Sequence, residues 1–160
     1  MKILGIDPGY DRLGVAVLEK PLKGKEVVLY SDCFTTLKEE NIHIRLLQIG
    51  TEIGRLLDEF KPEKLAIETL FIDKNQKTGM RVSEARGIII YEATKRNVAV
   101  FEYSPMEIKM AVTGDGTSDK QRIFKMVNML VKLPAKKTPD DEYDAIAVAL
   151  TCSARNNSKT

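Results

Sequence analysis

Four acidic residues stand at positions where a folded chain would gather them into one metal site. Asp7 ends the first apolar run of the chain, and Glu68 ends a second, shorter one. Asp141 and Asp144 open an apolar helix, and their spacing of three residues places both carboxylates on one face. Four carboxylates that converge repel one another strongly, so they require divalent cations.

The chemical type of these side chains indicates the ion and the reaction. A set of carboxylate oxygens without cysteine or histidine favours Mg²⁺ or Mn²⁺ over zinc. Two such ions about 3.5–4 Å apart activate water and stabilise the leaving oxygen in phosphodiester cleavage. The sequence therefore predicts metal-dependent cleavage of a nucleic acid.

Each acid also has a simpler interpretation when it is taken alone. Asp7 precedes a Pro-Gly pair, and aspartate often opens a turn. Glu68 fits the exit of a strand into solvent, whereas Asp141 and Asp144 fit the acidic first turn that a helix dipole favours. Asp140 lies four residues before Asp144, so spacing alone does not separate it from the ligands. The prediction therefore depends on the set of four.

The apolar pattern predicts the elements that position these acids. Three β-rich runs joined by short turns indicate an antiparallel meander, and later strands alternate with helices. Two helix starts carry N-cap residues, at Ser104 with Pro105 and at Ser118. The predicted order is strands at 2–6, 15–18 and 27–34, a helix over 42–60, a strand at 65–67, a polar loop over 69–81, a helix over 83–96, a strand at 98–103, two helices, and a last helix over 138–154.

This order predicts an α/β fold with a mixed five-stranded sheet flanked by helices. Three antiparallel strands come first and two parallel strands follow. We expect one domain over residues 1–160, with a frayed tail over 155–160.

Composition and charge are those of an ordinary globular protein. Hydrophobic residues make up 43% of the 160 residues and charged residues 30%, and the net charge of +2 does not by itself indicate a nucleic-acid partner. Cys33 and Cys152 have no metal-ligand spacing, and His43 is interpreted as structural. We expect reduced thiols in a cytoplasmic protein without a signal peptide or a membrane span.

Six segments, in order and over nearly the whole chain, resemble the RuvC family of Holliday-junction resolvases. They are GIDPG at 5–9, AIE at 66–68 with Phe71, EARG at 84–87, FEY at 101–103, KLPA at 132–135 and DEYDAIA at 141–147. The resemblance implies a ribonuclease-H-like fold and a homodimer. It also implies paired symmetric nicks in four-way DNA junctions, with 5′-phosphate and 3′-hydroxyl ends, in homologous recombination and DNA repair.

The same resemblance implies roles for particular residues and partners. Asp7, Glu68, Asp141 and Asp144 fall on the family's catalytic acids, which hold two Mg²⁺ per subunit with Mn²⁺ as a substitute. Lys109 and Lys120 fall on basic residues that are important for cleavage and phosphate contact. A branch-migration complex of the RuvA and RuvB type is the implied working partner.

Further DNA contacts are expected close to the acids. Lys74, Lys77 and Arg81 lie just after Glu68, where they are placed to contact phosphates. Phe71 either packs into the core or stacks on an unpaired base at the junction centre.

Some residues depart from the family pattern. Glu142 and Tyr143 replace small residues between the last two acids, and on a helix they are expected to point away from the acid face. The loop over 76–81 also differs. The apolar residues Ile88 to Tyr91 give the predicted helix over 83–96 more apolar surface than one face needs, a feature of self-association surfaces.

Three other functions are compatible with parts of the sequence. A ribonuclease-H-like nuclease of the YqgF group acts on RNA and begins with a similar Asp-Pro-Gly turn. A non-catalytic junction-binding protein would bind without cutting, yet an unused set of four acids is an electrostatic cost. Actin-like ATPases share the turn but need two such domains to enclose a nucleotide.

Overall fold

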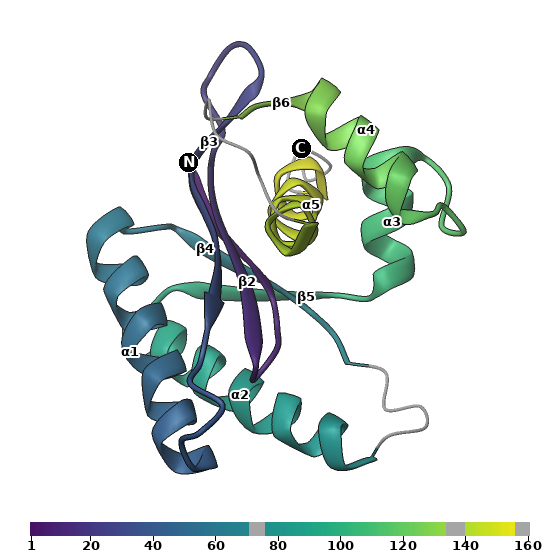
Figure 1. Cartoon of the computed structure of the whole chain (residues 1–160). Helices are drawn as coiled ribbons and strands as arrows, with labels where there is room; N and C mark the ends of the chain where they lie inside the picture. The colour runs from purple at the N-terminus through teal and green to yellow at the C-terminus, as the bar shows by residue number, and fades with distance from the viewer. Residues whose placement is uncertain (71–75, 134–139, 156–160) are drawn as a thin grey trace.

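The computed structural model describes residues 1–70, 76–133 and 140–155, and its centre is a mixed six-stranded sheet (Figure 1). The strand order across the sheet is β5-β4-β1-β2-β3-β6. The strands are β1 (Lys2–Asp7), β2 (Arg12–Glu19), β3 (Glu26–Thr35), β4 (Lys64–Glu68), β5 (Ala99–Tyr103) and β6 (Val131–Lys132).

The pairing confirms the mixed sheet that the sequence predicts and adds one strand to it. β1, β2 and β3 are antiparallel neighbours, and β4 and β5 extend the sheet in parallel from β1. The prediction of five strands was one too few, because β6 pairs in parallel with β3 through only two residue pairs. A two-residue strand is too short to produce a readable alternation of apolar and polar side chains.

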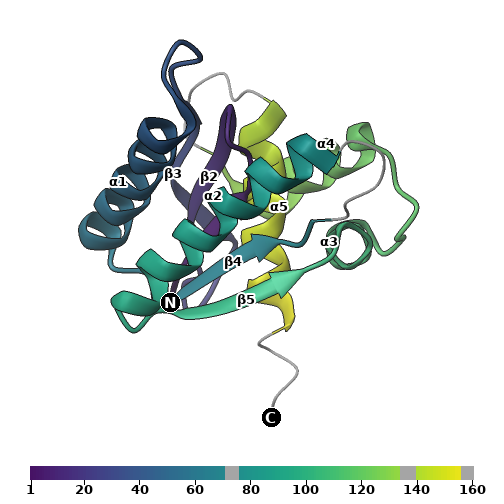
Figure 2. The same ribbon diagram turned by 90° about the horizontal axis from the view of Figure 1, so that it is seen from below.

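Within the described part of the chain, five helices cover the two faces of the sheet. Figure 1 shows the first two helices on one face and the last three on the other, and Figure 2 shows the same division from below. Each face buries its own apolar cluster. The helices are α1 (Ile42–Phe60), α2 (Gln76–Lys95), α3 (Pro105–Thr113), α4 (Lys120–Leu130) and α5 (Asp140–Arg155).

Two predicted helix starts were wrong, and the second strand begins at Arg12, three residues earlier than predicted. α2 begins at Gln76, so the polar stretch up to residue 81 is helical where it is described, and helix propensity there outweighs the single glycine. The N-cap of α4 is Asp119, whose carboxylate accepts from the backbone of Arg122 at 2.8 Å, and Ser118 is turned inward. The capping box at Ser104 is confirmed. Among the helices described, none has the length and apolarity to cross a membrane.

Candidate active site

Two neighbouring strands deliver two acids to the same edge of the sheet. β1 and β4 are parallel, and Ile6 is the register partner of Ile67. The next residues along each strand are Asp7 and Glu68, which are the last residues of β1 and β4. Because the carboxyl ends of parallel strands lie at one edge, both side chains leave the sheet together.

Two glycines let α5 approach these strands closely enough to add its own acids. A Cβ on Gly5 would lie 2.3 Å from the carbonyl oxygen of Ala145. A Cβ on Gly14 would lie 2.5 Å from the carbonyl oxygen of Asp141 and 3.1 Å from the Cβ of Asp7. Gly14 is also the register partner of Asp7. The absence of these two side chains is therefore what brings the first turn of α5 against the end of β1.

Three of the four predicted acids form a tight cluster. Ligand oxygens of Asp7, Asp141 and Asp144 all lie within 4.8 Å of one another. Glu68 is outside this group but lines the same cavity of about 360 Å³ as Asp7 and Asp144. Asp140 belongs to neither, since it lines a different cavity between α4 and α5. Spacing in the sequence left that point open.

Burial and mutual repulsion oppose ionisation of the two strand-end acids. Burial raises the pKa of Asp7 to about 6, and the charges of Asp144 and Asp141 add to the shift. Burial likewise raises the pKa of Glu68 to about 7, with further contributions from Asp7 and Asp144. A bound cation would offset this repulsion, so the potential in the cavity favours a divalent metal ion.

The donor set fits Mg²⁺ or Mn²⁺. All the candidate ligand atoms are carboxylate oxygens, which are hard donors. The three ligand oxygens lie close enough together that Asp7, Asp141 and Asp144 would hold such an ion, with Glu68 lining the same cavity.

Two cations already lie against the acids of α5. Lys120 forms an ion pair with Asp144 at 3.0 Å, and Arg12 forms an ion pair with Asp141. The thiol of Cys33 donates to the same Asp141 carboxylate at 3.2 Å. No motif indicated Arg12 or Cys33 at this site, because they come from β2 and β3 and meet α5 only through the fold.

A third basic residue holds the end of β4. Arg86 on α2 donates to the main-chain carbonyl of Glu68 and forms an ion pair with Glu102 on β5. Its charge also lowers the pKa of Glu68, against the larger effect of burial. Arg86 lies in one of the motifs quoted above, yet only the structure shows that it fixes the strand end carrying Glu68.

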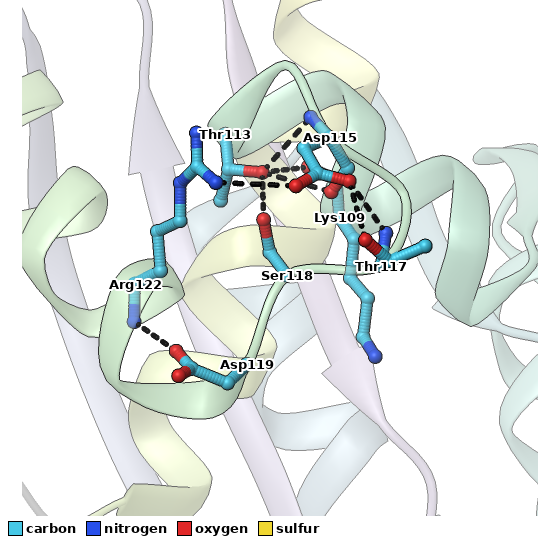
Figure 3. A network of polar contacts seen from close by, with 7 residues as sticks. All are labelled: Lys109, Thr113, Asp115, Thr117, Ser118, Asp119 and Arg122. Atoms are coloured by element: carbon cyan, nitrogen blue, oxygen red, sulfur yellow. Dashed lines mark hydrogen bonds and ion pairs between the residues drawn. The ribbon is translucent and has the colours of Figure 1, made fainter.

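A network of polar contacts in the turn between α3 and α4 joins the two helices that carry the lysines of the cavity (Figure 3). Asp115 accepts from the backbone and hydroxyl of Thr117 at 2.9 and 2.7 Å and pairs with Arg122 at 3.1 Å. Thr113 closes the turn through its hydroxyl, which lies 2.6 Å from that of Ser118. This network fixes α3 and α4 relative to each other, and Lys109 and Lys120 project from them into the cavity with the acids.

The other predicted DNA-binding residues are placed differently. Lys77 is exposed in the first turns of α2, and Arg81 pairs with Glu84 at 2.9 Å on the same helix. Phe71 and Lys74 lie outside the described residues.

The two residues between the acids of α5 point away from the acid cluster, as helix geometry predicts. Glu142 is buried and accepts a hydrogen bond from Ser31 on β3. Tyr143 is buried against Phe124, with ring centroids 4.3 Å apart. Both side chains anchor the first turn of α5 to the layers on either side of it.

Comparison with known proteins identifies the family. The family model "Crossover junction endodeoxyribonuclease RuvC" matches residues 3–152. Curated relatives of that name include those of Thermosipho melanesiensis, 45% identical over 93% of this chain and 94% of the relative, and Petrotoga mobilis, 42% identical over 93% and 91%.

Solved structures give the same result. The Thermus thermophilus RuvC structure superimposes with a TM-score of 0.90 at 30% identity, over 98% of this chain and 96% of that one. Thermus thermophilus RuvC in complex with a Holliday junction substrate gives a TM-score of 0.90 at 29% identity, over 98% and 94%. By sequence and by fold, this chain belongs to the RuvC family of crossover junction endodeoxyribonucleases.

Proposed function

We propose that this protein resolves four-way (Holliday) DNA junctions by paired symmetric nicks, in homologous recombination and DNA repair. The observation that carries the proposal is the meeting of Asp7, Asp141 and Asp144 at one sheet edge, with Glu68 in the same cavity. This site lies in a chain whose relatives are named crossover junction endodeoxyribonucleases and whose fold matches a RuvC bound to a Holliday junction.

The four acids have the role of ligands for two Mg²⁺ ions, which Mn²⁺ would replace. Such ions supply an activated water and stabilise the leaving oxygen of the scissile phosphodiester, which gives 5′-phosphate and 3′-hydroxyl ends. The chain's own contribution is to hold the carboxylates on two paired strand ends and on one helix turn that packs closely against them. Arg86 keeps the Glu68 strand end in place.

Lysines beside the acids position the DNA backbone. Lys109 and Lys120 line the cavity with Asp7 and Glu68, where their charges attract a phosphate and their ammonium groups donate to its oxygens. Lys77 and Arg81 are proposed as outer phosphate contacts at the start of α2, and Lys74 as another. Phe71 is proposed to stack on an unpaired base at the opened junction centre.

A homodimer would place two such sites on a junction that itself has two-fold character. The apolar surface that the sequence indicated is partly exposed: Ile88 and Tyr91 of α2 line a groove with Leu47 of α1, and Tyr91 and Leu47 are exposed. We assign this groove to the subunit interface. A branch-migration complex of the RuvA and RuvB type is the proposed partner on the junction.

Junction cleavage by Asp7→Asn tests the proposal. The variant should bind a four-way junction at least as well as the wild type, because one negative charge is lost, and cut it at least about a hundredfold more slowly in Mg²⁺. Glu68→Gln should behave similarly. Glu39→Gln, which removes an exposed carboxylate in the loop before α1, is the matched control and should cut normally.

The mapped products separate the proposal from its alternatives. Symmetric nicks on two opposing strands, with ends that a ligase seals, support junction resolution. Cleavage of structured RNA instead of a mobile junction would indicate an RNA nuclease, and metal-independent binding without any cut would indicate a non-catalytic junction-binding protein. Wild-type cutting by Asp7→Asn would overturn the metal assignment.

A further inference from the structure

A second cavity adjoins the acid site and has no role in the function proposed so far. It encloses about 480 Å³ between α4 and α5, which is within the range of small-ligand sites. Its walls are mostly apolar, with charged groups at the edge. The lining residues are Lys120, Gln121, Ile123, Phe124 and Lys125 of α4 and Asp140, Tyr143 and Asp144 of α5.

Two aromatic rings contribute to the wall of this cavity, with their planes tilted by 43° to each other. Tyr143 is only 7% exposed, and its hydroxyl donates to the side chain of Asn128 at 3.3 Å. Asn128 in turn donates to the main-chain carbonyl of Phe124 at 2.8 Å. The Phe124 ring lies against Tyr143, yet Phe124 is 44% exposed. Tyr143 thus packs against Phe124, which lines the cavity and keeps part of its side chain exposed.

The cavity and the acid site share part of their walls. Lys120, Ile123 and Asp144 line both spaces, so the 3.0 Å ion pair between Lys120 and Asp144 belongs to the shared wall. If one DNA strand occupies both spaces, the group in the aromatic cavity would therefore be a near neighbour, along the strand, of the phosphate at the acids. In a DNA strand, the group closest to a phosphate that has flat apolar faces is a base of one of the two flanking nucleotides.

We propose that this cavity receives an unpaired nucleobase next to the scissile phosphate, stacked on Phe124. This inference rests on the proposed junction cleavage. Aromatic side chains stack on any base through its π-face, and the faces of a base inside a duplex are covered by its neighbours, so only a base that has left the helix enters.

The polar rim of the cavity is complementary to a nucleotide. Lys120 and Lys125 attract the adjoining phosphates, which favours a nucleic acid over an apolar peptide segment. The amide of Gln121 and the carboxylate of Asp140 face the same space and match the hydrogen-bonding edge of a base. Phe124 and Tyr143 thereby add recognition of one nucleotide to a site otherwise directed at the backbone.

A cycle of one protein change and one DNA change tests the inference. Phe124→Leu keeps apolar packing on Tyr143 but removes the aromatic face. An abasic site placed on either side of the mapped cut removes the base. In the wild type, the abasic site at one of the two positions should slow single-turnover cutting about tenfold. In Phe124→Leu, the intact junction should be slowed about tenfold, and the abasic site should add nothing further, because both changes remove one contact.

Controls separate stacking from packing. Phe124→Trp keeps an aromatic face, so it should cut the intact junction at the wild-type rate and be slowed by the abasic site as the wild type is. Met129→Ala, which removes another exposed apolar side chain of α4, should leave both unchanged. Junction affinity in Ca²⁺ should fall less than about threefold in Phe124→Leu, since most of it comes from phosphate contacts. Independent, multiplicative losses, or wild-type cutting by Phe124→Leu, would overturn the inference.

Failure of the proposed function would show itself separately. If the wild type does not cut an intact junction, the function is wrong, and the cavity is then tested by binding of a short single-stranded oligonucleotide in Ca²⁺. Phe124→Leu should weaken that binding about tenfold relative to wild type and Phe124→Trp. Equal affinity for all three proteins would show that the cavity binds no base.

Discussion

At the scale of single residues, Asp141 has more hydrogen-bond and ion-pair partners among the described residues than the other three acids of the site. It forms an ion pair with Arg12, and it accepts from the Cys33 thiol at 3.2 Å. Both partners compete with a metal ion for the same carboxylate oxygens. Arg12 is 62% exposed in its side chain, so its pairing with Asp141 is open to solvent and readily exchanged.

Arg12→Gln is expected to tighten metal binding. Removing the guanidinium frees the Asp141 carboxylate and lowers the local positive charge, so the dissociation constant for Mn²⁺ should fall about threefold, the size of a typical exposed ion pair. Isothermal titration calorimetry at low salt measures it. Arg55→Gln removes an exposed arginine that pairs with Glu52 and Glu59 on α1 and should leave the affinity unchanged. Weaker Mn²⁺ binding by Arg12→Gln would mean that Arg12 orients Asp141 for the metal.

At the scale of elements, the sequence predicted what local patterns encode. Alternation, turn residues and caps predicted the meander, the mixed sheet and the capping box at Ser104. They failed where the signal was short or ambiguous: β6 has two residues, and Ser118 and Asp119 are both good N-cap residues. The capping choice is made by Thr113, whose hydroxyl holds Ser118 inward.

The candidate site was predictable to a similar degree. The four acids could be proposed as one site because each lies at the end of an element, and the structure brings three of them together with Glu68 in the same cavity. Partners such as Arg12, and the pairing of Phe124 with Tyr143, are not adjacent in sequence and no short motif encodes them. The contact of Phe124 with Tyr143 depends on the packing of α4 against α5. The contact of Arg12 with Asp141 depends on how closely α5 approaches the sheet, which Gly5 and Gly14 permit.

Gly14→Ala is therefore expected to damage the site from a position that carries no functional group. The new Cβ would lie 2.5 Å from the Asp141 carbonyl, so the first turn of α5 must move away from β1. We expect junction cutting to fall at least about tenfold and the free energy of unfolding to fall by about 1–3 kcal/mol. Denaturant unfolding and a cleavage time course measure both.

Gly87→Ala is the matched control for that change. Gly87 lies within α2, and a Cβ there meets nothing within 4 Å. Alanine should therefore stabilise the helix by about 0.5–1 kcal/mol and leave cutting unaltered. If Gly14→Ala cuts as fast as Gly87→Ala, close approach of α5 does not set the geometry of the acids.

At the scale of the whole molecule, the sheet separates two tasks. One face, under α3, α4 and α5, carries the acids, the lysines and the aromatic cavity. On the other face, α1 and α2 form the exposed groove that is assigned to the subunit interface. The acids join the two at the ends of the central strands β1 and β4, so their charge state affects the stability of the entire fold.

This coupling predicts how stability depends on pH without metal. The folded protein raises the pKa of Asp7 from 3.8 to about 6 and that of Glu68 from 4.5 to about 7. Between about pH 4 and pH 7 the folded state therefore binds more protons than the unfolded state, so these two groups make stability fall as pH rises. In EDTA, Asp7→Asn with Glu68→Gln should lose that contribution and be more stable than the wild type at pH 8.

Metal should reverse the trend, because it binds the folded state and competes with the same protons. Thermal unfolding in saturating Mg²⁺ or Mn²⁺ should show a gain in melting temperature over EDTA that is small at pH 5 and grows to pH 8. The doubly substituted protein should show little gain at either pH. An equal gain in wild type and variant would place the ion elsewhere on the molecule. A wild-type gain that shrinks as pH rises would mean that protonation of Asp7 and Glu68 does not limit metal binding.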